Sequence, residues 1–281
     1  MGKFRDKLVE IKHNSRFLTW MWYLGRQPLF IFREQKIKAA AKKRAAGYED
    51  DRYLSIKKYK GLHKGERCFI VATGPSLRLS DLDMLNNEYT FGMNAIPLLF
   101  DQTEWRPTYY GIQDFRAYEK MEGILNIAYK EADNVFVADV IANRFTVPSN
   151  FNIFPHDLAY NFNQLEIEKY FAKFSGDCYS IIYDGYTITY SLIQLAIYMG
   201  FSELYLLGVD CNYKKGEKNH IVETGAVDKN EDKNYEKMIV AYKEAKKYAD
   251  EHDIKIINCT RGGMLDIYPR MPLEEALKEK V

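Results

Sequence analysis

The stretch Cys68-Phe-Ile-Val-Ala72, followed directly by Thr73-Gly74-Pro75-Ser76, decides the fold that we predict for this chain. A short apolar run that ends in a Gly-Pro turn is typical of a buried parallel strand that feeds a loop at the edge of its sheet. Glycine lets backbone N–H groups approach an anion closely, and the Ser76 hydroxyl adds a further donor. Turns of this composition are common, so the tetrapeptide alone also fits a purely structural turn.

Similar apolar runs recur along the chain with helical stretches between them. We expect five more strands, at 89–94, 108–114, 134–139, 203–210 and 255–260. An almost uncharged helix is expected over 187–199, closed by Gly200, and a second helix over 233–250. Strands that alternate with helices predict an α/β protein with a Rossmann-like, doubly wound, mostly parallel sheet covered on both faces.

The composition is that of an ordinary globular protein. Of the 281 residues, 47% are hydrophobic and 28% are charged, which excludes an intrinsically disordered chain. The four cysteines are far apart in the sequence and form no C-x-x-C pair, so we interpret them as reduced residues of a cytosolic protein and expect no metal site.

The charge is unevenly distributed along the chain. Residues 1–44 hold 12 Lys and Arg against three acids, a charge of +9, and the remainder holds 28 against 36, a charge of −8. We therefore expect a basic helical extension over 1–58 and a nucleotide-binding domain over 59–281. The acidic domain should not favour nucleic acid as a partner.

The basic extension also carries an apolar stripe, at Phe4, Leu8, Ile11, Leu18 and Trp22. No apolar run in it is long enough for a transmembrane helix, and no signal peptide is evident. One interpretation is that residues 1–44 bind the anionic surface of a membrane, with tryptophans at the headgroups. The other is a helical hairpin that packs on the domain or on a second copy in a homo-oligomer.

Polar side chains follow several predicted strands at the point where each strand ends. Asn94 follows the second strand, Gln113 and Asp114 follow the third, and Asp210 follows the fifth. Ligands of doubly wound sheets bind beyond the carboxyl ends of the strands, so these side chains predict a binding edge. Turn formation and helix capping would account for the same residue types.

Two further segments belong to that predicted edge. The uncharged helix begins with Tyr186-Thr-Ile-Thr-Tyr-Ser191, where hydroxyls and free N–H groups suit a phosphate or simply cap the helix. His220 lies in the long loop after Asp210, where an imidazole can act as a base near neutral pH.

These segments, taken in order, resemble the MptE-like (6-hydroxymethylpterin diphosphokinase-like) domain, which is related to the Maf flagellin glycosyltransferases and to family 42 sialyltransferases. The resemblance covers about residues 60–275 and rests on the following pieces: Phe69-Ile-Val-Ala-Thr-Gly-Pro-Ser-Leu77, Asn94, Asp114, Tyr186-Thr-Ile-Thr-Tyr190, the run from Leu195 to Asp210, Asn258-Cys-Thr-Arg-Gly-Gly263 and Tyr268-Pro-Arg270. It implies a sheet of the GT-A-like sialyltransferase type.

The resemblance also implies roles for individual residues. Those implied to contact a nucleotide are Thr73, Gly74, Pro75, Ser76, Asn94, Asp114, Thr187, Thr189 and Asn212. Those implied to be catalytic are His220 as the base, Asp210 for orientation and Tyr213 beside the departing phosphate. The chain departs from the family pattern in two ways, since the expected tyrosine two positions after Asp210 is Asn212, and His220 lies farther from the following helix.

We expect a metal-independent glycosyltransferase that moves a sugar from a nucleotide-sugar donor, CMP-linked, to a cell-surface glycan or lipid-linked acceptor in the cytoplasm, at the inner face of the membrane. The alternative is an ATP-dependent pyrophosphokinase acting on 6-hydroxymethyl-dihydropterin, which would need Mg²⁺ held by Asp114 and Asp210. A non-catalytic adaptor for membranes or nucleic acid is disfavoured, because it leaves the residues of the binding edge unexplained.

Overall fold

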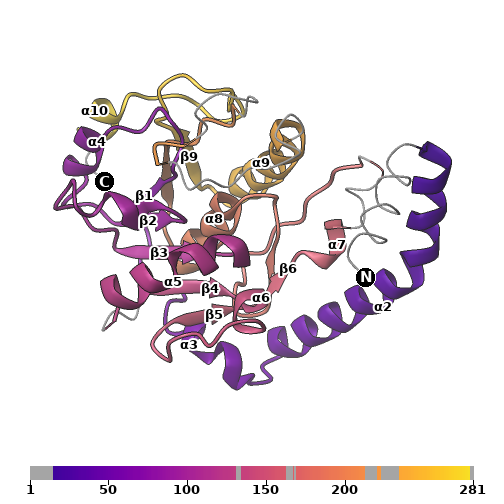
Figure 1. Ribbon diagram of the computed structural model, residues 1–281. Helices are drawn as coiled ribbons and strands as arrows, with labels where there is room; N and C mark the ends of the chain where they lie inside the picture. The colour runs from indigo at the N-terminus through magenta and orange to yellow at the C-terminus, as the bar shows by residue number, and fades with distance from the viewer. Residues whose placement is uncertain are drawn as a thin grey trace.

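The computed structural model describes residues 15–130, 134–162, 167, 169–212, 220–222 and 234–278. Within these residues the chain forms a seven-stranded sheet of order β5-β4-β3-β2-β1-β8-β9, in which every neighbouring pair of strands is parallel (Figure 1). Its strands are β1 Arg67–Val71, β2 Thr90–Met93, β3 Tyr109–Ile112, β4 Val135–Ala138, β5 Asn152–Phe154, β8 Glu203–Leu207 and β9 Lys255–Asn258. The predicted Rossmann-like α/β fold is confirmed.

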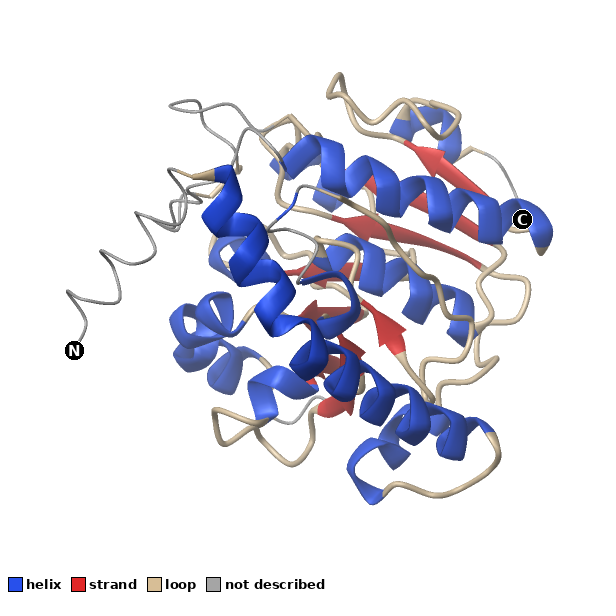
Figure 2. Ribbon diagram, turned by 90° about the vertical axis from the view of Figure 1, so that its right-hand side faces the viewer, coloured by secondary structure: helices blue, strands red, loops and turns tan. Residues whose placement is uncertain are grey.

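Side chains of each strand alternate between two apolar layers, as the pleat of a strand requires. In β1, Cys68 and Ile70 pack toward one face of the sheet, and Phe69 and Val71 pack toward the other. A strand that is apolar on both faces needs helices on both, and the structure supplies them (Figure 2).

Helices α8 Ile188–Met199 and α9 Asn234–Glu251 belong to the first layer, where α8 crosses β1, β2 and β3. The predicted limits of α8 are confirmed: Thr187 caps its start, and Gly200 ends it in a left-handed conformation with φ 98°. The second face is covered by α5 Phe115–Ala128 and by three short elements, namely α4 Leu79–Asp83, η2 Ile96–Leu99 and α10 Leu273–Ala276.

The order of the strands creates one place where the chain reverses direction across the sheet. From β1 the chain runs outward through β2, β3, β4 and β5, and it then returns through α8 to place β8 on the other side of β1. The chain therefore leaves β1 toward β2 and leaves β8 toward β9, in opposite directions along the sheet. Ligands of doubly wound sheets bind beyond the carboxyl ends of the strands at such a switch point.

Between β5 and α8 the chain forms short elements that the sequence did not predict. These are a two-stranded parallel sheet of β6 His156–Asp157 and β7 Ile182–Tyr183, and the helix α7 Ala159–Phe162. The helix α6 Asp139–Ala142 directly follows β4.

The described part of the N-terminal region forms the helix α2 Arg16–Ala45, which has Pro28 in its interior (Figure 1). Its end is fixed to the domain by Arg44, whose guanidinium donates to the carbonyl of Ser180 at 2.7 and 3.1 Å. Phe4, Leu8 and Ile11 of the expected apolar stripe lie outside the described residues. No helix in the described part of the chain is both long and apolar enough to cross a membrane.

The elements η1 Asp51–Tyr53 and α3 Leu54–Lys57 join α2 to the sheet. Tyr53 and Ile56 are buried in the same apolar layer as α8, together with Tyr59. The domain boundary that we propose at residue 58 thus falls within a segment that contributes to the core of the domain.

Candidate functional site

A pocket of about 450 Å³, including its space open to solvent, lies at the crevice between β1 and β8. Its walls come from the loops after β1, β2 and β8 and from the start of α8. Of the residues singled out from the sequence, those that line it are Thr73, Gly74, Asn94, Thr187, Thr189, Asp210, Asn212 and His220. Residues from five separate segments of the chain thus meet in one cavity.

The turn after β1 is locked against the turn after β8. The Gly74 N–H donates to the Gly208 carbonyl at 2.9 Å, and the Ser76 hydroxyl donates to Oδ2 of Asp210 at 2.8 Å. A Cβ on Gly74 would lie 2.3 Å from that same Gly208 carbonyl, so only glycine permits this approach. Ser76 therefore acts through Asp210 and is not itself among the residues that line the pocket.

The carboxylate of Asp210 is held deep in the wall of the pocket, and the residue is only 9% exposed. A second loop supports it from behind, since the Met264 N–H donates to the Asp210 carbonyl at 2.7 Å. Gly263, with φ 73°, packs so closely that a Cβ there would lie 2.7 Å from the same oxygen. The contact between Gly263 and Asp210 was not predicted from the sequence.

Asn94 and the first turn of α8 form the opposite wall. Asn94 has a left-handed backbone with φ 46°, and its Oδ1 is buried without a hydrogen-bond partner among the described groups. The Tyr110 hydroxyl donates to the Asn94 carbonyl at 2.6 Å and fixes that conformation. Thr187 caps α8 by accepting from the Thr189 N–H at 3.3 Å. Hydroxyls, an amide and the positive end of a helix dipole therefore face the cavity.

His220 reaches the pocket because its segment is fastened to the turn after β1. Its Nδ1 lies 3.1 Å from the Thr73 hydroxyl, and the next residue, Ile221, donates its N–H to the Thr73 carbonyl at 2.8 Å. His220 is thus placed beside the same turn that carries Gly74. Tyr213, the other loop residue singled out from the sequence, lies outside the described residues.

Asp114 and Pro75 are not among the residues that line the pocket. The carboxylate of Asp114 caps α5, accepting from the N–H groups of Arg116 at 2.6 Å and Ala117 at 3.2 Å. Asp114 therefore has the helix-capping role that is common for Asn and Asp. The pyrophosphokinase alternative requires Asp114 and Asp210 to hold one Mg²⁺ together. In the structure only Asp210 lines the pocket, whereas Asp114 caps α5.

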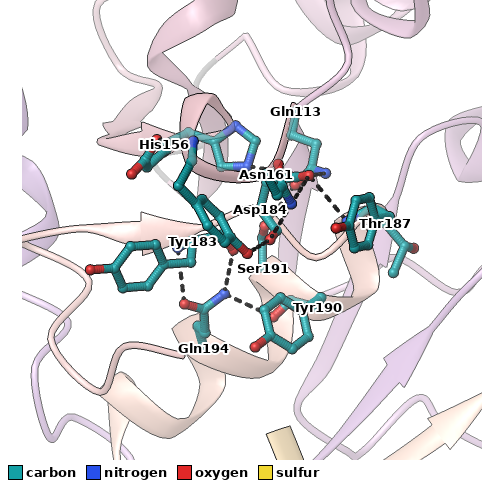
Figure 3. A network of polar contacts seen from close by, with 12 residues as sticks. Gln113, His156, Asn161, Tyr183, Asp184, Thr187, Tyr190, Ser191 and Gln194 are labelled. Carbon is teal, nitrogen blue, oxygen red and sulfur yellow. Dashed lines mark hydrogen bonds and ion pairs between the residues drawn. The ribbon is translucent and has the colours of Figure 1, made fainter. Parts of the chain in front are cut away.

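Gln113, which was predicted to lie at the binding edge, does not line the pocket but belongs to a polar cluster beside it, whose other members were not predicted (Figure 3). Asp184 accepts from Gln113 Nε2 and from Asn161 Nδ2, both at 3.2 Å, and Gln113 accepts from the Ser191 hydroxyl at 2.7 Å. The Nε2 atom of His156 lies 3.6 Å from Asp184. Because Ser191 belongs to the first turns of α8, the cluster ties the end of β3 to the helix start that lines the pocket.

We expect the buried negative charge of Asp210 to lower the stability of the folded protein. Burial raises the pKa of the Asp210 carboxyl, and the hydrogen bond from Ser76 opposes part of that rise. A carboxyl with a raised pKa holds its proton more tightly in the folded state, so the folded protein loses stability as the pH rises through this pKa. Asp210→Asn should therefore melt roughly 2–4 °C higher than wild type at neutral pH, the shift that about 1 kcal/mol produces in a large domain.

This difference in melting temperature should shrink as the pH falls toward the ordinary range of a carboxyl, about 4. Asp101→Asn, at an exposed aspartate, is the matched control and should melt like wild type at both pH values. A lower melting temperature for Asp210→Asn at neutral pH would show instead that the carboxylate stabilises the empty protein.

No protein-family model matches the chain, and no curated protein sequence is significantly similar to it. Among solved structures, the chain is similar to the Maf glycosyltransferase from Magnetospirillum magneticum AMB-1, with 16% identity and a TM-score of 0.44. That match covers 80% of this chain but only 38% of the Maf chain. The chain is also similar to the sialyltransferase CstII from Campylobacter jejuni in complex with cytidine-5'-monophosphate, with 16% identity, a TM-score of 0.41 and coverage of 75% of this chain and 86% of CstII. Likeness of this extent does not by itself assign a substrate to this chain.

Proposed function

We propose that this chain is a glycosyltransferase that uses a CMP-linked sugar as its donor. The observation that carries the proposal is the pocket at the switch point of the sheet, where the start of α8 presents N–H groups and hydroxyls to an anion and the Gly74 turn lines the same cavity. The order of motifs along the sequence resembles that of the MptE-like and sialyltransferase families and supports the same assignment.

In this proposal the phosphate of the donor lies at the start of α8. As the bond between the sugar and the phosphate oxygen breaks, negative charge develops on the departing CMP. The dipole and the N–H groups of α8, with the hydroxyls of Thr187 and Thr189, stabilise that charge. These groups supply the stabilisation that a divalent metal gives in other transferases.

The acceptor hydroxyl attacks the sugar carbon while His220 takes its proton. An imidazole suits this task near neutral pH, and His220 is anchored at the edge of the pocket by Thr73. Asn94, whose Oδ1 has no partner among the described groups, accepts a hydrogen bond from the donor. Asp210 orients the turn through Ser76, and Asn212 contacts the nucleotide from the loop after β8. The acceptor is a cell-surface glycan or a lipid-linked precursor of one.

The proposal predicts which nucleotide stabilises the protein. At a CMP concentration about a hundred times its Kd, binding adds about 2.7 kcal/mol, which raises the melting temperature of a domain of this size by roughly 5–10 °C. The rise should persist in the presence of a chelator, and UDP, GDP and ATP should give smaller rises. A rise with ATP and Mg²⁺ but none with CMP would contradict the proposal and favour the pyrophosphokinase.

Asn94→Gly is the variant that ties this effect to the pocket. Glycine accepts the left-handed backbone of Asn94 without strain but removes the unpartnered amide oxygen, so the stabilisation by CMP should fall by at least half. Asn86→Gly, at an exposed asparagine, is the matched control and should keep the full rise.

A further inference from the structure

The first half of α2 exposes large apolar side chains to solvent. We refer to the following nine as the outer arc, each between 40% and 71% exposed: Phe17, Leu18, Trp20, Met21, Trp22, Leu24, Leu29, Ile31 and Phe32. A helix that packs on its own domain turns its apolar side chains toward the core, so this exposure is the reverse of the usual arrangement.

The nine side chains share one side of the helix. At about 100° per residue they span an arc of roughly 200°, and the stretch from Phe17 to Phe32 holds a single charge, Arg26, which falls outside that arc. The opposite side faces the domain, where Phe30 stacks on Phe162 and Glu34 pairs with Lys173 at 3.0 Å. The outer arc is therefore directed away from these contacts with the domain.

Beyond Phe32 the same side of the helix becomes basic. The side chains that continue the outer arc there are Lys36, Lys38, Lys42 and Lys43, and all four residues are exposed. An uncharged arc with tryptophans, followed by lysines on the same side, matches the layers of an acidic lipid leaflet: acyl chains and interface first, then anionic headgroups.

A second copy of the chain fits this surface less well than a lipid leaflet does. A pair of helices buries a seam much narrower than an arc of about 200°. In a parallel pair the lysines of the two copies would face each other, and in an antiparallel pair they would face the outer arc of the partner. A lipid leaflet can cover the whole arc and meets the lysines with charges of opposite sign.

We propose that residues 17–32 lie in the interface of an acidic membrane, with the outer arc among the acyl chains and the four lysines among the headgroups. The inference goes beyond the proposed function and holds whichever ligand the pocket binds. The segment that joins α2 to the sheet contacts the carboxyl edge, the edge that carries the pocket: the Tyr53 hydroxyl of η1 donates to Asp139, directly after β4, at 2.9 Å.

The tryptophans provide a test in the full-length protein. Of the three in the chain, Trp20 and Trp22 belong to the outer arc, whereas Trp105 is 1% exposed in the core of the domain. Vesicles of phosphatidylcholine and phosphatidylglycerol should shift the tryptophan emission to shorter wavelength, and lipids brominated along the acyl chains should quench it. Vesicles of phosphatidylcholine alone should have a much weaker effect, and salt should reverse binding.

Two matched pairs of variants assign the effect to the proposed surface. Ile31→Asp should weaken binding to the acidic vesicles about tenfold or more. The change removes an aliphatic side chain that the membrane would bury, and it adds a negative charge that the anionic headgroups repel. Ile127→Asp, the same change at the 83% exposed Ile127 of α5, should bind like wild type. Lys43→Glu should also weaken binding about tenfold, and Lys247→Glu on α9 should not.

Circular dichroism and the melting temperature without ligand check that each variant is folded. Two results together would overturn the proposal in favour of a second copy. The tryptophan emission would not change with vesicles but would shift with protein concentration, and the sedimentation coefficient would show an oligomer in wild type but not in Ile31→Asp. Equal vesicle binding by Ile31→Asp and Ile127→Asp would also overturn it. Loss of the CMP effect alone would leave this inference standing and contradict only the proposed function.

Discussion

Gly74→Val should abolish CMP binding, weakening it by about a hundredfold or more. A Cβ at position 74 would lie 1.9 Å from Oδ2 of Asp210 and 2.3 Å from the Gly208 carbonyl. The carboxylate can rotate away, but the carbonyl belongs to the backbone, so the turns after β1 and β8 must separate. That movement displaces Thr73 and Asp210 from the pocket together. Isothermal titration with CMP measures the loss.

Gly123→Val is the control for the size of the new side chain. Gly123 lies in α5 with no atom within 4 Å of its Cβ position, so the variant should bind CMP like wild type. Because Gly74→Val also strains the fold, Ser76→Ala serves as a milder second variant that removes only the hydroxyl bonded to Asp210. CMP affinity that is unchanged in both pocket variants would rule out this turn as the nucleotide site.

The sheet was predictable from the sequence because its central strands are apolar on both faces. In β1 and β8 every residue but the first is buried, and a continuous apolar run of this length is typical of a parallel strand that is covered on both faces. The strand β5 was missed because Asn152-Ile-Phe154 is short and begins with a polar residue that is buried only through its tertiary contacts. The strands β6 and β7 have two residues each, too few for a periodic pattern.

The pocket was predictable in part for a topological reason. Parallel strands bring their carboxyl ends to one edge, so the sequence alone could place Gly74, Asn94 and Asp210 together. The supports behind them could not be placed in this way. Gly263 packs against Asp210, and Asp184 holds Gln113, through contacts between segments far apart in the sequence. Nothing in the local sequence of either residue signals its partner.

The helix α2 shows a further limit of sequence patterns. The apolar spacing of Leu18 and Trp22 predicted a helix with an apolar side, but it left open whether that side packs on the domain or faces outward. The direction depends on the anchors at the other end of the helix, where Glu34 and Arg44 attach the opposite side to the domain. Such anchors are tertiary contacts, so only the structure decides the orientation.

His220→Ala should lower turnover by about a hundredfold or more while CMP affinity stays nearly unchanged. A general base acts mainly in the transition state, so its loss reduces kcat rather than the binding of the donor. Release of CMP from a CMP-linked nonulosonic acid in the presence of an acceptor glycan measures turnover, and isothermal titration measures affinity. His252→Ala, at an exposed histidine directly after α9, is the matched control and should keep full turnover.

The contact between His220 and Thr73 separates catalysis from positioning. Thr73→Val keeps the shape of the turn but removes the hydroxyl 3.1 Å from Nδ1 of His220. If His220 is the base and Thr73 only orients it, Thr73→Val should lose less turnover than His220→Ala, and combining the two changes should cost no more than His220→Ala alone. Turnover that survives in His220→Ala would move the role of base to another residue. In that case Tyr213, in the same loop, is the next residue to substitute.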